Sequence, residues 1–425
     1  MTKKLLDDCF AHDKKRLRHG EALSLLKQRV NPVAGLQMVP LAETAGRILA
    51  EDAVSPRPVP AHTNAAVDGY SFAFADYDAT GGKLPVEGRA TAGHRLALPP
   101  VPGVAARIFT GAVIPQGHDT VVMQEDVAEG TADGRVVVMV PPGVKRGANV
   151  RQAGEDLHAG ATLLAAGSVL RPQDIAALAS IGMAEVACRA RLNVAVISTG
   201  DEVVRPGTEL SEGFVYDANA PMLQALIASA GALPVDLGIL PDDPERIRHD
   251  LAAAAQDYDA VILSGGASRG EEDHVVAALD ALGKRHLWQL AIKPGRPMSF
   301  GQIGDCVVLG LPGNPVAVFV CFLLYAWPLI RRLGGAEWPE PHRYRLPALF
   351  AFPGRKPGRR EFWRGTLKET PHGLGVDKFA RDGSGLISGL RVADGLIDIP
   401  EDAADVQPGD RVAFIPFSEY GIVGK

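Results

Sequence analysis

Four short loops of the 425-residue chain combine small residues, carboxylates and helix-starting residues directly behind apolar runs. They read STGDEV at 198–203, LPDDP at 240–244, SGGASRGEED at 264–273 and LPGNP at 311–315. Glycines let a ligand approach the backbone, and Asn314 followed by Pro315 suits a helix start whose free N–H groups bind phosphate. Carboxylates such as Asp201 and Glu202 would repel phosphate on their own. A cleft that holds both kinds of group therefore predicts a phosphorylated ligand bridged by Mg²⁺.

Basic residues lie in two further segments. Lys293 and Arg296 belong to IKPGRP, and Arg359, Arg360 and Arg364 belong to GRREFWRG. Arginine presents a planar fork of donors that suits phosphate or another oxyanion. These side chains are the candidates for holding the anionic groups of the ligand.

Each motif also has a purely structural explanation. The acids at 271–273 could complement the positive end of the helix that they open, and Asp201 with Glu202 could form a solvated turn. KPGRP could be a type II turn, and the arginines near the end of the chain could be surface charges. Four such loops at one edge of one sheet favour a shared site over four separate explanations.

The elements that must position these loops are clearest between residues 191 and 335. Near-continuous apolar runs at 192–199, 234–240, 258–266 and 305–313 alternate with amphipathic stretches at 219–231, 243–255, 271–283 and after Asn314. This alternation predicts a doubly wound, mostly parallel α/β domain with helices on both faces of the sheet. Ligands of such domains bind at the carboxyl ends of the strands, where the four loops lie.

The rest of the chain is predicted to form three further parts. Residues 61–154 are rich in glycine and proline with short valine-rich runs, which indicates a small β domain. Residues 1–60 and 155–190 have mixed helical and extended patterns, and if they pack together the β domain is inserted between them. Residues 336–425 alternate like a small C-terminal β-barrel-like domain.

Composition narrows the class of protein. The net charge is −6 with no run of five like charges, which argues against binding to nucleic acid or a membrane surface. The four cysteines form no metal or disulfide spacing, and the N-terminus has no secretory h-region, so a cytoplasmic protein with buried thiols is expected. The apolar run at 316–330 is shorter than the ~20 residues of a membrane span and is predicted to be a buried helix.

Nine segments then resemble one family, in its order, from about residue 20 to the C-terminus. They are TNAAVDGYSF, RIFTGAVIPQGHDTVVMQED, RQAGEDLHAG, VISTGDEV, YDAN, SGGASRGEEDHV, LAIKPGRPMSFG, GLPGNPVAVFV and DGSGLISGLRVADGL. They resemble the molybdopterin molybdenumtransferases, bacterial relatives of the enzymatic end of gephyrin. The resemblance implies a Mg²⁺-dependent enzyme of molybdenum cofactor biosynthesis that inserts molybdate into adenylated molybdopterin and releases AMP.

The resemblance implies site roles for those residues of this chain that match the family's motifs. The resemblance assigns catalytic roles to Asp68, Thr110, Glu202, Asp273 and Lys293, and metal contacts to Asp201, Glu202, Asp243 and Asp273, with Asp242 as the alternative to Asp243. It assigns substrate contacts to Asp156, Ser264, Gly265, Gly266, Ser268, Arg296, Pro312, Gly313, Asn314, Arg359 and Ser384. Two positions depart from the family pattern: Ala267 replaces a valine, and Arg296 replaces the second lysine of a Lys-Pro-Gly-Lys turn. Arg269 occupies a variable position, where it could grip a phosphate or pair with an acid.

The resemblance also implies a homodimer in which Asp68 and Thr110 reach the α/β cleft of the other subunit. Two other functions stay open at this point. One is molybdopterin adenylyltransferase, against which the additional N- and C-terminal domains argue. The other is a non-catalytic, gephyrin-like scaffold, which the complete set of acids and lysine disfavours.

Overall fold

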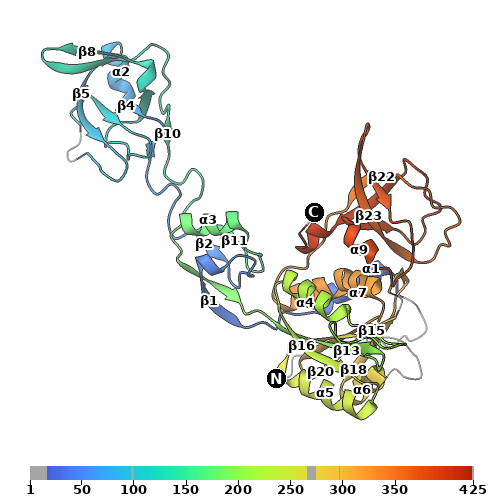
Figure 1. Ribbon diagram of the computed structural model, residues 1–425. Helices are drawn as coiled ribbons and strands as arrows, with labels where there is room; N and C mark the ends of the chain where they lie inside the picture. The colour runs from blue at the N-terminus through green and yellow to red at the C-terminus, as the bar shows by residue number, and fades with distance from the viewer. Residues whose placement is uncertain (1–16, 97–99, 266–273, 296, 424–425) are drawn as a thin grey trace.

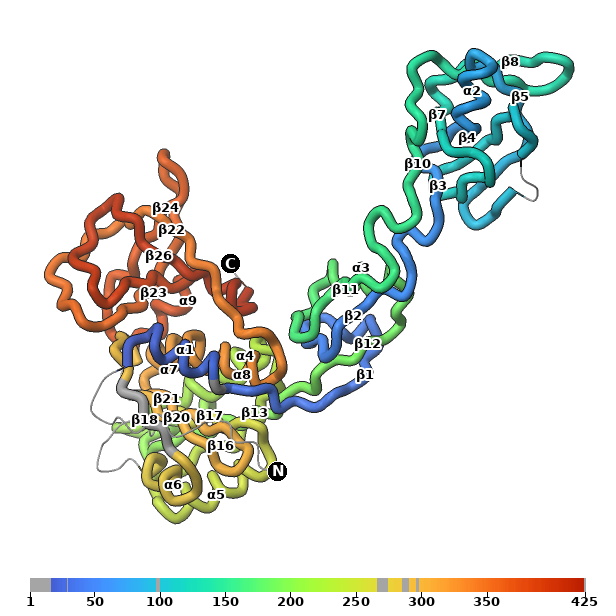
Figure 2. The backbone as a smooth tube through the Cα atoms, turned by 180° about the vertical axis from the view of Figure 1, so that it is seen from behind, coloured from blue at the N-terminus to red at the C-terminus, as the bar shows by residue number. Residues whose placement is uncertain are grey.

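The computed structural model describes residues 17–96, 100–265, 274–295 and 297–423. Figures 1 and 2 show an elongated molecule: a large C-terminal half, a narrow middle region, and a small β domain at the far end. The three cysteines within the described residues, Cys188, Cys306 and Cys321, are buried and free, as the sequence predicts. Cys9 lies outside the described residues.

The α/β domain is built on a six-stranded sheet with the order β16-β13-β17-β21-β20-β18. Its strands are β13 (Asn193–Thr199), β16 (Leu233–Leu240), β17 (Ala260–Ser264), β18 (Lys284–Gln289), β20 (Pro297–Ile303) and β21 (Cys306–Leu311). The first four strands in that order are parallel and coincide with the four predicted apolar runs, which confirms the predicted mostly parallel sheet. The antiparallel β18 and β20 at one edge were not predicted as strands.

Helices cover both faces of this sheet (Figure 1). One face carries α1 (His19–Arg29), α4 (Asn219–Ser229) and the long helix that runs as α7 (Pro315–Cys321), the π-helical η3 (Phe322–Ala326) and α8 (Trp327–Leu333); the other carries α5 (Pro244–Asp257) and α6 (His274–Leu282). Side chains of β13 alternate between the faces: Val194 and Val196 join the core on the α4 side, whereas Ala195 and Ile197 join the core on the α5 side. Burial on both faces explains the unbroken apolar runs in the sequence.

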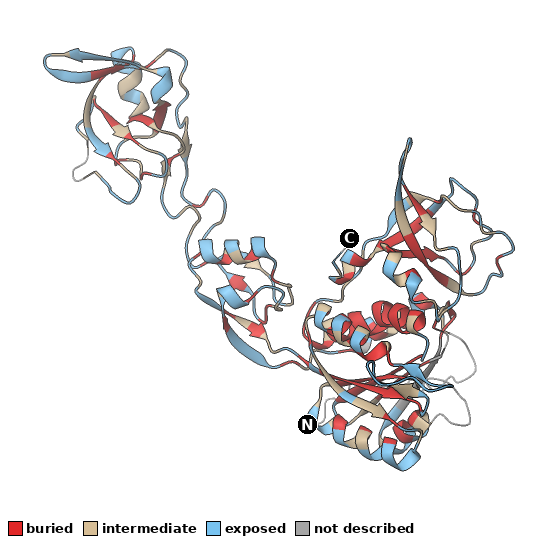
Figure 3. Ribbon diagram, viewed as in Figure 1, coloured by how far each residue is buried: buried red, intermediate tan, exposed pale blue. Residues whose placement is uncertain are grey.

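The long helix is buried along most of its length, as its red ribbon in Figure 3 shows. Its residues Pro315–Leu333 are long and apolar enough to cross a membrane, but 89% of the most apolar 18-residue window in that stretch is buried inside the fold. This confirms the prediction of a buried helix at 316–330. Its apolar surface is used by the sheet, by α1 and by the C-terminal domain.

The chain passes through the middle region twice, once on its way to the small β domain and once on its way back. In the middle region, β1 (Leu36–Pro40) pairs with β12 (Glu185–Arg189), and β2 (Ala53–Val54) pairs with β11 (Thr162–Leu164), beside α3 (Pro172–Ser180). Further out, β3 (Asn64–Ala65) pairs with β10 (Val150–Arg151). The β domain beyond them has α2 (Phe74–Thr80) and a sheet of β7 (Thr120–Met123), β4 (Gly69–Phe72), β6 (Ala105–Ile108), β5 (Lys83–Ala90), β9 (Arg135–Met139) and β8 (Ala128–Ala132).

Helix α1 packs differently from what the sequence suggested. The prediction grouped residues 1–60 with 155–190, and residues 36–54 do pair with strands of the second segment. Ala22 and Leu26 of α1, however, belong to the core between the α/β sheet and the C-terminal domain. The domain limits stay a prediction, with α1 packed on the α/β domain.

The C-terminal domain is a small, nearly closed barrel. Its strands are β22 (Tyr344–Pro347), β23 (Arg360–Thr370), β24 (Gly373–Lys378), β25 (Gly395–Ile399) and β26 (Arg411–Pro416), with α9 (Ser388–Val392) beside them. A bridge between Ala348 and Val376 links β22 to β24 and closes the ring. The two-residue strand β19 (Ile292–Lys293) leaves the α/β sheet and pairs with β23 of the barrel. Lys293 is thereby fixed where the two domains meet.

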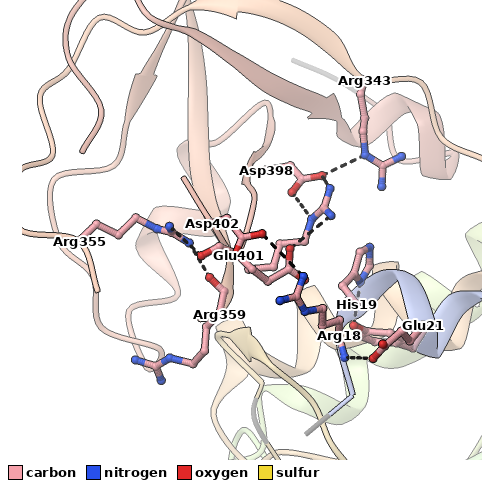
Figure 4. A network of polar contacts seen from close by, with 11 residues as sticks. Arg18, His19, Glu21, Arg343, Arg355, Arg359, Asp398, Glu401 and Asp402 are labelled. Atoms are coloured by element: carbon pink, nitrogen blue, oxygen red, sulfur yellow. Dashed lines mark hydrogen bonds and ion pairs between the residues drawn. The ribbon is translucent and has the colours of Figure 1, made fainter. Parts of the chain in front are cut away.

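A buried polar network lies on the α1 side of this junction (Figure 4). Asp398 is fully buried and accepts hydrogen bonds from Arg360 at 2.6 and 2.8 Å and from Arg343 at 3.0 Å. Next to it, His19 Nδ1 lies 2.8 Å from the hydroxyl of Tyr325 in the long helix. Burial, assisted by the charge of Arg360, lowers the pKa of His19 to about 3, so this imidazole is neutral at neutral pH.

Asp398 should contribute strongly to stability. Burial raises its pKa, but the hydrogen bonds and charges of Arg360 and Arg343 outweigh burial and hold the pKa below its ordinary value. Asp398→Asn leaves Arg360 with only its longer contact to Glu401, at 3.8 Å, among the described acids, and should cost about 3 kcal/mol. Urea unfolding followed by tryptophan fluorescence measures the loss.

The matched control is Asp377→Asn, which breaks the exposed pair with Lys368 in the same barrel and should cost less than about 1 kcal/mol. Because the pKa of Asp398 is lowered, its contribution should be complete above about pH 4 and lost as the pH falls through the folded-state pKa. Equal losses in the two variants would contradict a special role for the buried pair.

Candidate active site

A cavity of about 1230 Å³ opens at the carboxyl edge of the parallel strands. The loops behind β13, β17 and β21 line it, together with the turn after β19 and a loop of the C-terminal domain. Eight of the predicted site residues lie in its wall: Glu202, Ser264, Gly265, Lys293, Pro312, Gly313, Asn314 and Ser384. The sheet topology therefore brings these loops together as the strand pattern predicts.

A chain of buried hydrogen bonds fixes the floor of the cavity. Ser198 at the end of β13 donates to Asp217 at 2.6 Å, and Asp217 accepts from the backbone N–H groups of Asn219 and Ala220 at the start of α4. The side-chain amide of Asn219 donates to Ser264 Oγ at 2.8 Å and to the carbonyl of Gly313 at 2.7 Å. Three strand-end loops are thus tied to one helix start.

A glycine with positive φ directly follows each of the strands β13 and β17. Gly265 has φ of +98°, and a Cβ atom there would lie 2.5 Å from Thr199 Oγ1. Gly200 has φ of +135°, and a Cβ atom would lie 2.4 Å from the carboxylate of Glu202. The positive φ disfavours a side chain at both positions, and at Gly265 the lack of one lets the ends of β13 and β17 lie close together.

The predicted acids divide into two groups. Glu202 and Asp242 line the cavity. Asp201 instead accepts a hydrogen bond from the N–H of Asp242 at 3.1 Å, and the N–H of Asp201 donates to Asp242 at 3.3 Å, which joins the two loops. Asp243 caps α5, because its carboxylate accepts from the N–H of Arg246 at 2.8 Å. Of the two alternatives in the PDDP loop, Asp242 lies in the cavity and the assigned Asp243 does not.

The predicted cations have equally distinct positions. Lys293 lies in the cavity wall with its Nζ 3.4 Å from the buried carboxylate of Glu361. Arg360 is neutralised by Asp398, and Arg364 donates to the carbonyls of Leu386 and Arg381 at 2.8 and 2.6 Å. Both arginines bind groups of the C-terminal domain itself, so they are neither free ligand contacts nor the surface charges of the alternative explanation. Arg359 stands beside β19 at the start of β23 and lines neither this cavity nor the smaller one next to it.

The smaller cavity, of about 30 Å³, adjoins the large one beneath the C-terminal loop. Its wall contains four basic residues and one acid: Lys293, Arg364, Lys378, Arg381 and Asp382. Ser384 and Lys293 line both cavities, and the carbonyl of Ser384 accepts from the N–H of Val316 at 3.0 Å, so this loop docks on the start of the long helix. This pocket has the positive charge that a small oxyanion requires.

Three predicted residues lie far from both cavities within one chain. Asp68 and Thr110 belong to the small β domain at the other end of the molecule, and Asp156 is exposed on the arm that leads to it (Figure 1). Asp68 and Thr110 contact each other directly: the N–H and hydroxyl of Thr110 donate to Asp68 at 2.8 and 2.7 Å. These hydrogen bonds, the backbone one first, lower the pKa of Asp68 and keep it ionised. Arg107 adds positive charge from beside it.

Four predicted site residues, Gly266, Ser268, Asp273 and Arg296, lie outside the described residues, as do Ala267 and Arg269. Among the described residues, no group of three or more histidine, cysteine, aspartate or glutamate side chains gathers as a metal site.

The sequence assignment omitted Asp217 and Asn219, which organise the cavity floor. Both belong to YDAN, a segment that the resemblance had singled out. The sequence does contain a pattern that could have indicated them. An aspartate stands two residues before an asparagine that starts a helix, and such an aspartate often accepts hydrogen bonds from the backbone N–H groups of that helix.

Three family models match the chain in succession. The MoeA N-terminal region (domain I and II) matches residues 17–182, the probable molybdopterin binding domain matches 195–332, and the MoeA C-terminal region (domain IV) matches 346–417. This order of domains defines a MoeA-type protein of molybdenum cofactor biosynthesis.

Whole-chain similarities agree. The chain is 37% identical over 380 residues to the molybdopterin molybdenumtransferase of Haemophilus influenzae, covering 89% of this chain and 93% of the relative. It is 34% identical over 386 residues to molybdopterin molybdenumtransferase 2 of Mycobacterium tuberculosis H37Rv, covering 88% and 93%. The crystal structure of the molybdopterin biosynthesis MoeA protein from Pyrococcus horikoshii OT3 matches with a TM-score of 0.79 and 29% identity over 95% of this chain and 100% of that one. The chain belongs to the molybdopterin molybdenumtransferase family.

The contact between Asp68 and Thr110 makes a testable prediction. Thr110→Val removes the hydroxyl donor and should raise the pKa of Asp68 toward its ordinary value, although not fully, because the backbone N–H still donates. Thr110→Ser keeps the donor and should leave the pKa low. A pH titration of the Asp68 carboxyl carbon by NMR measures both; an unchanged pKa in Thr110→Val would contradict the role of the hydroxyl.

Proposed function

We propose that this protein transfers molybdate into adenylated molybdopterin, releasing AMP and molybdenum cofactor. The observation that carries the proposal is the pair of adjoining cavities. A large cleft with close-approach glycines and a helix start suits the pyrophosphate of the adenylated substrate, and a small basic pocket beside it suits a tetrahedral dianion. The two reactants would then meet at Lys293 and Ser384, which line both cavities.

The roles of individual groups follow from their positions. The backbone at Gly265, Gly313 and Asn314 would receive the pyrophosphate, with the start of the long helix behind it. Lys293 would neutralise charge that develops between phosphate and molybdate, because Glu361 holds its ammonium group at the junction of the cavities. Arg359, Arg296 and Asp156 remain proposed substrate contacts from the resemblance alone.

The donor set suits Mg²⁺. This ion takes oxygen ligands and commonly uses one or two carboxylates together with substrate phosphates. Glu202 and Asp242 are carboxylates in the same cavity wall as the proposed phosphate contacts, and Asp273 is the third proposed ligand. When bound, Mg²⁺ would neutralise the pyrophosphate and polarise its bridging bond. Asp201 would act by orienting the Asp242 loop.

The direct test is a turnover assay. Purified protein, adenylated molybdopterin, Mg²⁺ and molybdate should release AMP in a molybdate-dependent manner. Adenylation of molybdopterin with ATP would support the adenylyltransferase alternative instead, and tight binding with no turnover would support a scaffold. The reaction is proposed for the cytoplasm, with neither nucleic acid nor a membrane as partner.

Substitutions of the two aspartates in the PDDP loop should distinguish metal binding from helix capping. Asp242→Asn should lose most Mg²⁺-dependent turnover at unchanged stability, because it removes charge from the cavity at constant shape. Asp243→Ala should keep turnover but lower stability by about 1 kcal/mol, because it removes the cap of α5. AMP release at limiting Mg²⁺ and thermal unfolding measure the two effects. Wild-type turnover in Asp242→Asn would remove this residue from the metal site.

The distance between the β domain and the cleft motivates a shared site. Asp68 and Thr110 have family-matching positions, yet within one chain they lie at the opposite end of the molecule from Lys293 (Figure 1). We therefore propose a homodimer in which the β domain of one subunit completes the cleft of the other. In an isologous dimer both sites are completed in the same way.

Subunit mixing tests this proposal. Asp68→Ala and Lys293→Ala chains, each inactive alone, should regain activity when exchanged, because one of the two sites in each mixed dimer is free of both changes. With random exchange, recovery should approach roughly a quarter of the wild-type sites. Native mass spectrometry verifies the exchange. Confirmed exchange with no recovery would place both residues in the site of a single chain.

A further inference from the structure

Four arginines surround a crevice far from the catalytic cavity, where the middle region meets the α/β domain. Arg47, Arg189 and Arg191 line the crevice together with Gly46 and Gly231. The fourth, Arg331 of α8, lies against Gly231, since a Cβ atom built there would be 3.9 Å from its Nη1. The remaining wall is apolar or glycine, and no acidic residue lines it. We call this set of residues the arginine crevice.

Three of the four arginines, Arg47, Arg189 and Arg331, are partly buried, Arg191 is exposed, and the buried nitrogens of the first three have no partner among the described residues. The Nε atoms of Arg47, Arg189 and Arg331 are inaccessible to solvent and have no hydrogen-bond partner in the described chain. The bonds that these arginines do make go to neutral acceptors: Arg47 donates to Gln37 at 2.8 Å and to the carbonyl of Arg189 at 3.0 Å, and Arg189 donates to the carbonyl of Ala34 at 3.3 Å. Within the described residues, none of the four arginines forms an ion pair. Guanidinium groups that are partly withdrawn from water and have unpaired buried N–H donors ordinarily gain from an anionic partner.

Neighbouring residues pack against two of these arginine side chains. Gly335 has φ of +96°, and a Cβ atom there would lie 2.7 Å from the Arg189 side chain. Arg331 lies over the ring of Trp327, with Cζ 5.6 Å from the ring centroid. Arg47 and Arg189 come from the middle region, whereas Arg331 comes from the long helix of the α/β domain, so the crevice spans the junction between them.

We propose that the arginine crevice binds a small tetrahedral oxyanion of the sulfate or phosphate class. Arginine forks match the edges of such anions, and several of them converge here without an acid. The enclosed volume is about 20 Å³, room for roughly one or two oxygen-sized groups, so one edge of the anion enters and the other faces solvent. The bound anion links the middle region to the α/β domain and stiffens the junction from which the β domain extends. This site is independent of the proposed catalytic cavity.

The test uses sulfate as the probe and amide hydrogen exchange of the full-length protein as the readout. Sodium sulfate, compared with sodium chloride at equal ionic strength, should slow exchange in residues 44–50 and 186–192. The double variant Arg47→Gln/Arg189→Gln should raise the sulfate concentration needed for half-maximal protection at least tenfold. Arg191→Gln, a change at an exposed position, should weaken binding severalfold without affecting folding.

The matched control is Arg135→Gln/Arg248→Gln, which removes two exposed arginines that are already paired with acids and should leave the sulfate response unchanged. Equal exchange in sulfate and chloride would overturn the inference, as would an equal effect of the control variant. Protection that depends on protein concentration rather than sulfate would also overturn it, because the occupant would then be a carboxylate of a second copy of the chain.

Discussion

The shape of the cleft depends on the hydrogen bonds that the side-chain amide of Asn219 donates. Its two donor bonds, to Ser264 and to Gly313, tie the ends of two neighbouring parallel strands to the start of α4, and Asp217 extends the same network to Ser198 of a third strand. The strands would bring these loops to the same edge in any case, but only to within the freedom of the loops. The network removes that freedom, so a pyrophosphate would meet backbone donors already in place.

Some charged side chains form hydrogen bonds and ion pairs that stabilise the fold, whereas others lie in the cavity walls. Arg360 and Arg364, which look like oxyanion ligands in the sequence, are satisfied by Asp398 and by backbone carbonyls and hold the barrel together. Lys293 has one buried carboxylate partner at 3.4 Å and faces both cavities. Asp243 caps α5, and Asp201 accepts from the N–H of Asp242; neither lines the cavity. Asp242 and Glu202 lie in the cavity wall, although Asp242 also accepts from the N–H of Asp201 at 3.3 Å. Between the adjacent Asp242 and Asp243, the start of α5 decides which side chain caps the helix and which lies in the cavity wall.

The sequence predicts those features that follow from local periodicity. Runs of buried strand residues gave the four parallel strands, and the carboxyl-edge rule then located eight cavity residues. Features that depend on contacts between residues far apart in the sequence could not be predicted in the same way. The amphipathic pattern of α1 does not say which core receives it, and β18 and β20 are defined by their pairing rather than by an unbroken apolar run. The choice between Asp242 and Asp243 rests on which residue begins α5, a boundary that sequence patterns place only within a few residues.

The pairing of β3 with β10 sets Asn64 opposite Arg151, so the chain enters and leaves the small β domain at neighbouring points. A domain whose two ends lie close together can change its interior, or be exchanged for the domain of a relative. Neither change alters the path of the arm or the packing of the α/β core. Under the proposed shared site, the surface around Asp68 and Thr110 would be the part of the β domain that the cleft constrains. Its interior, with a hydrophobic core of its own, could then change without altering the α/β domain.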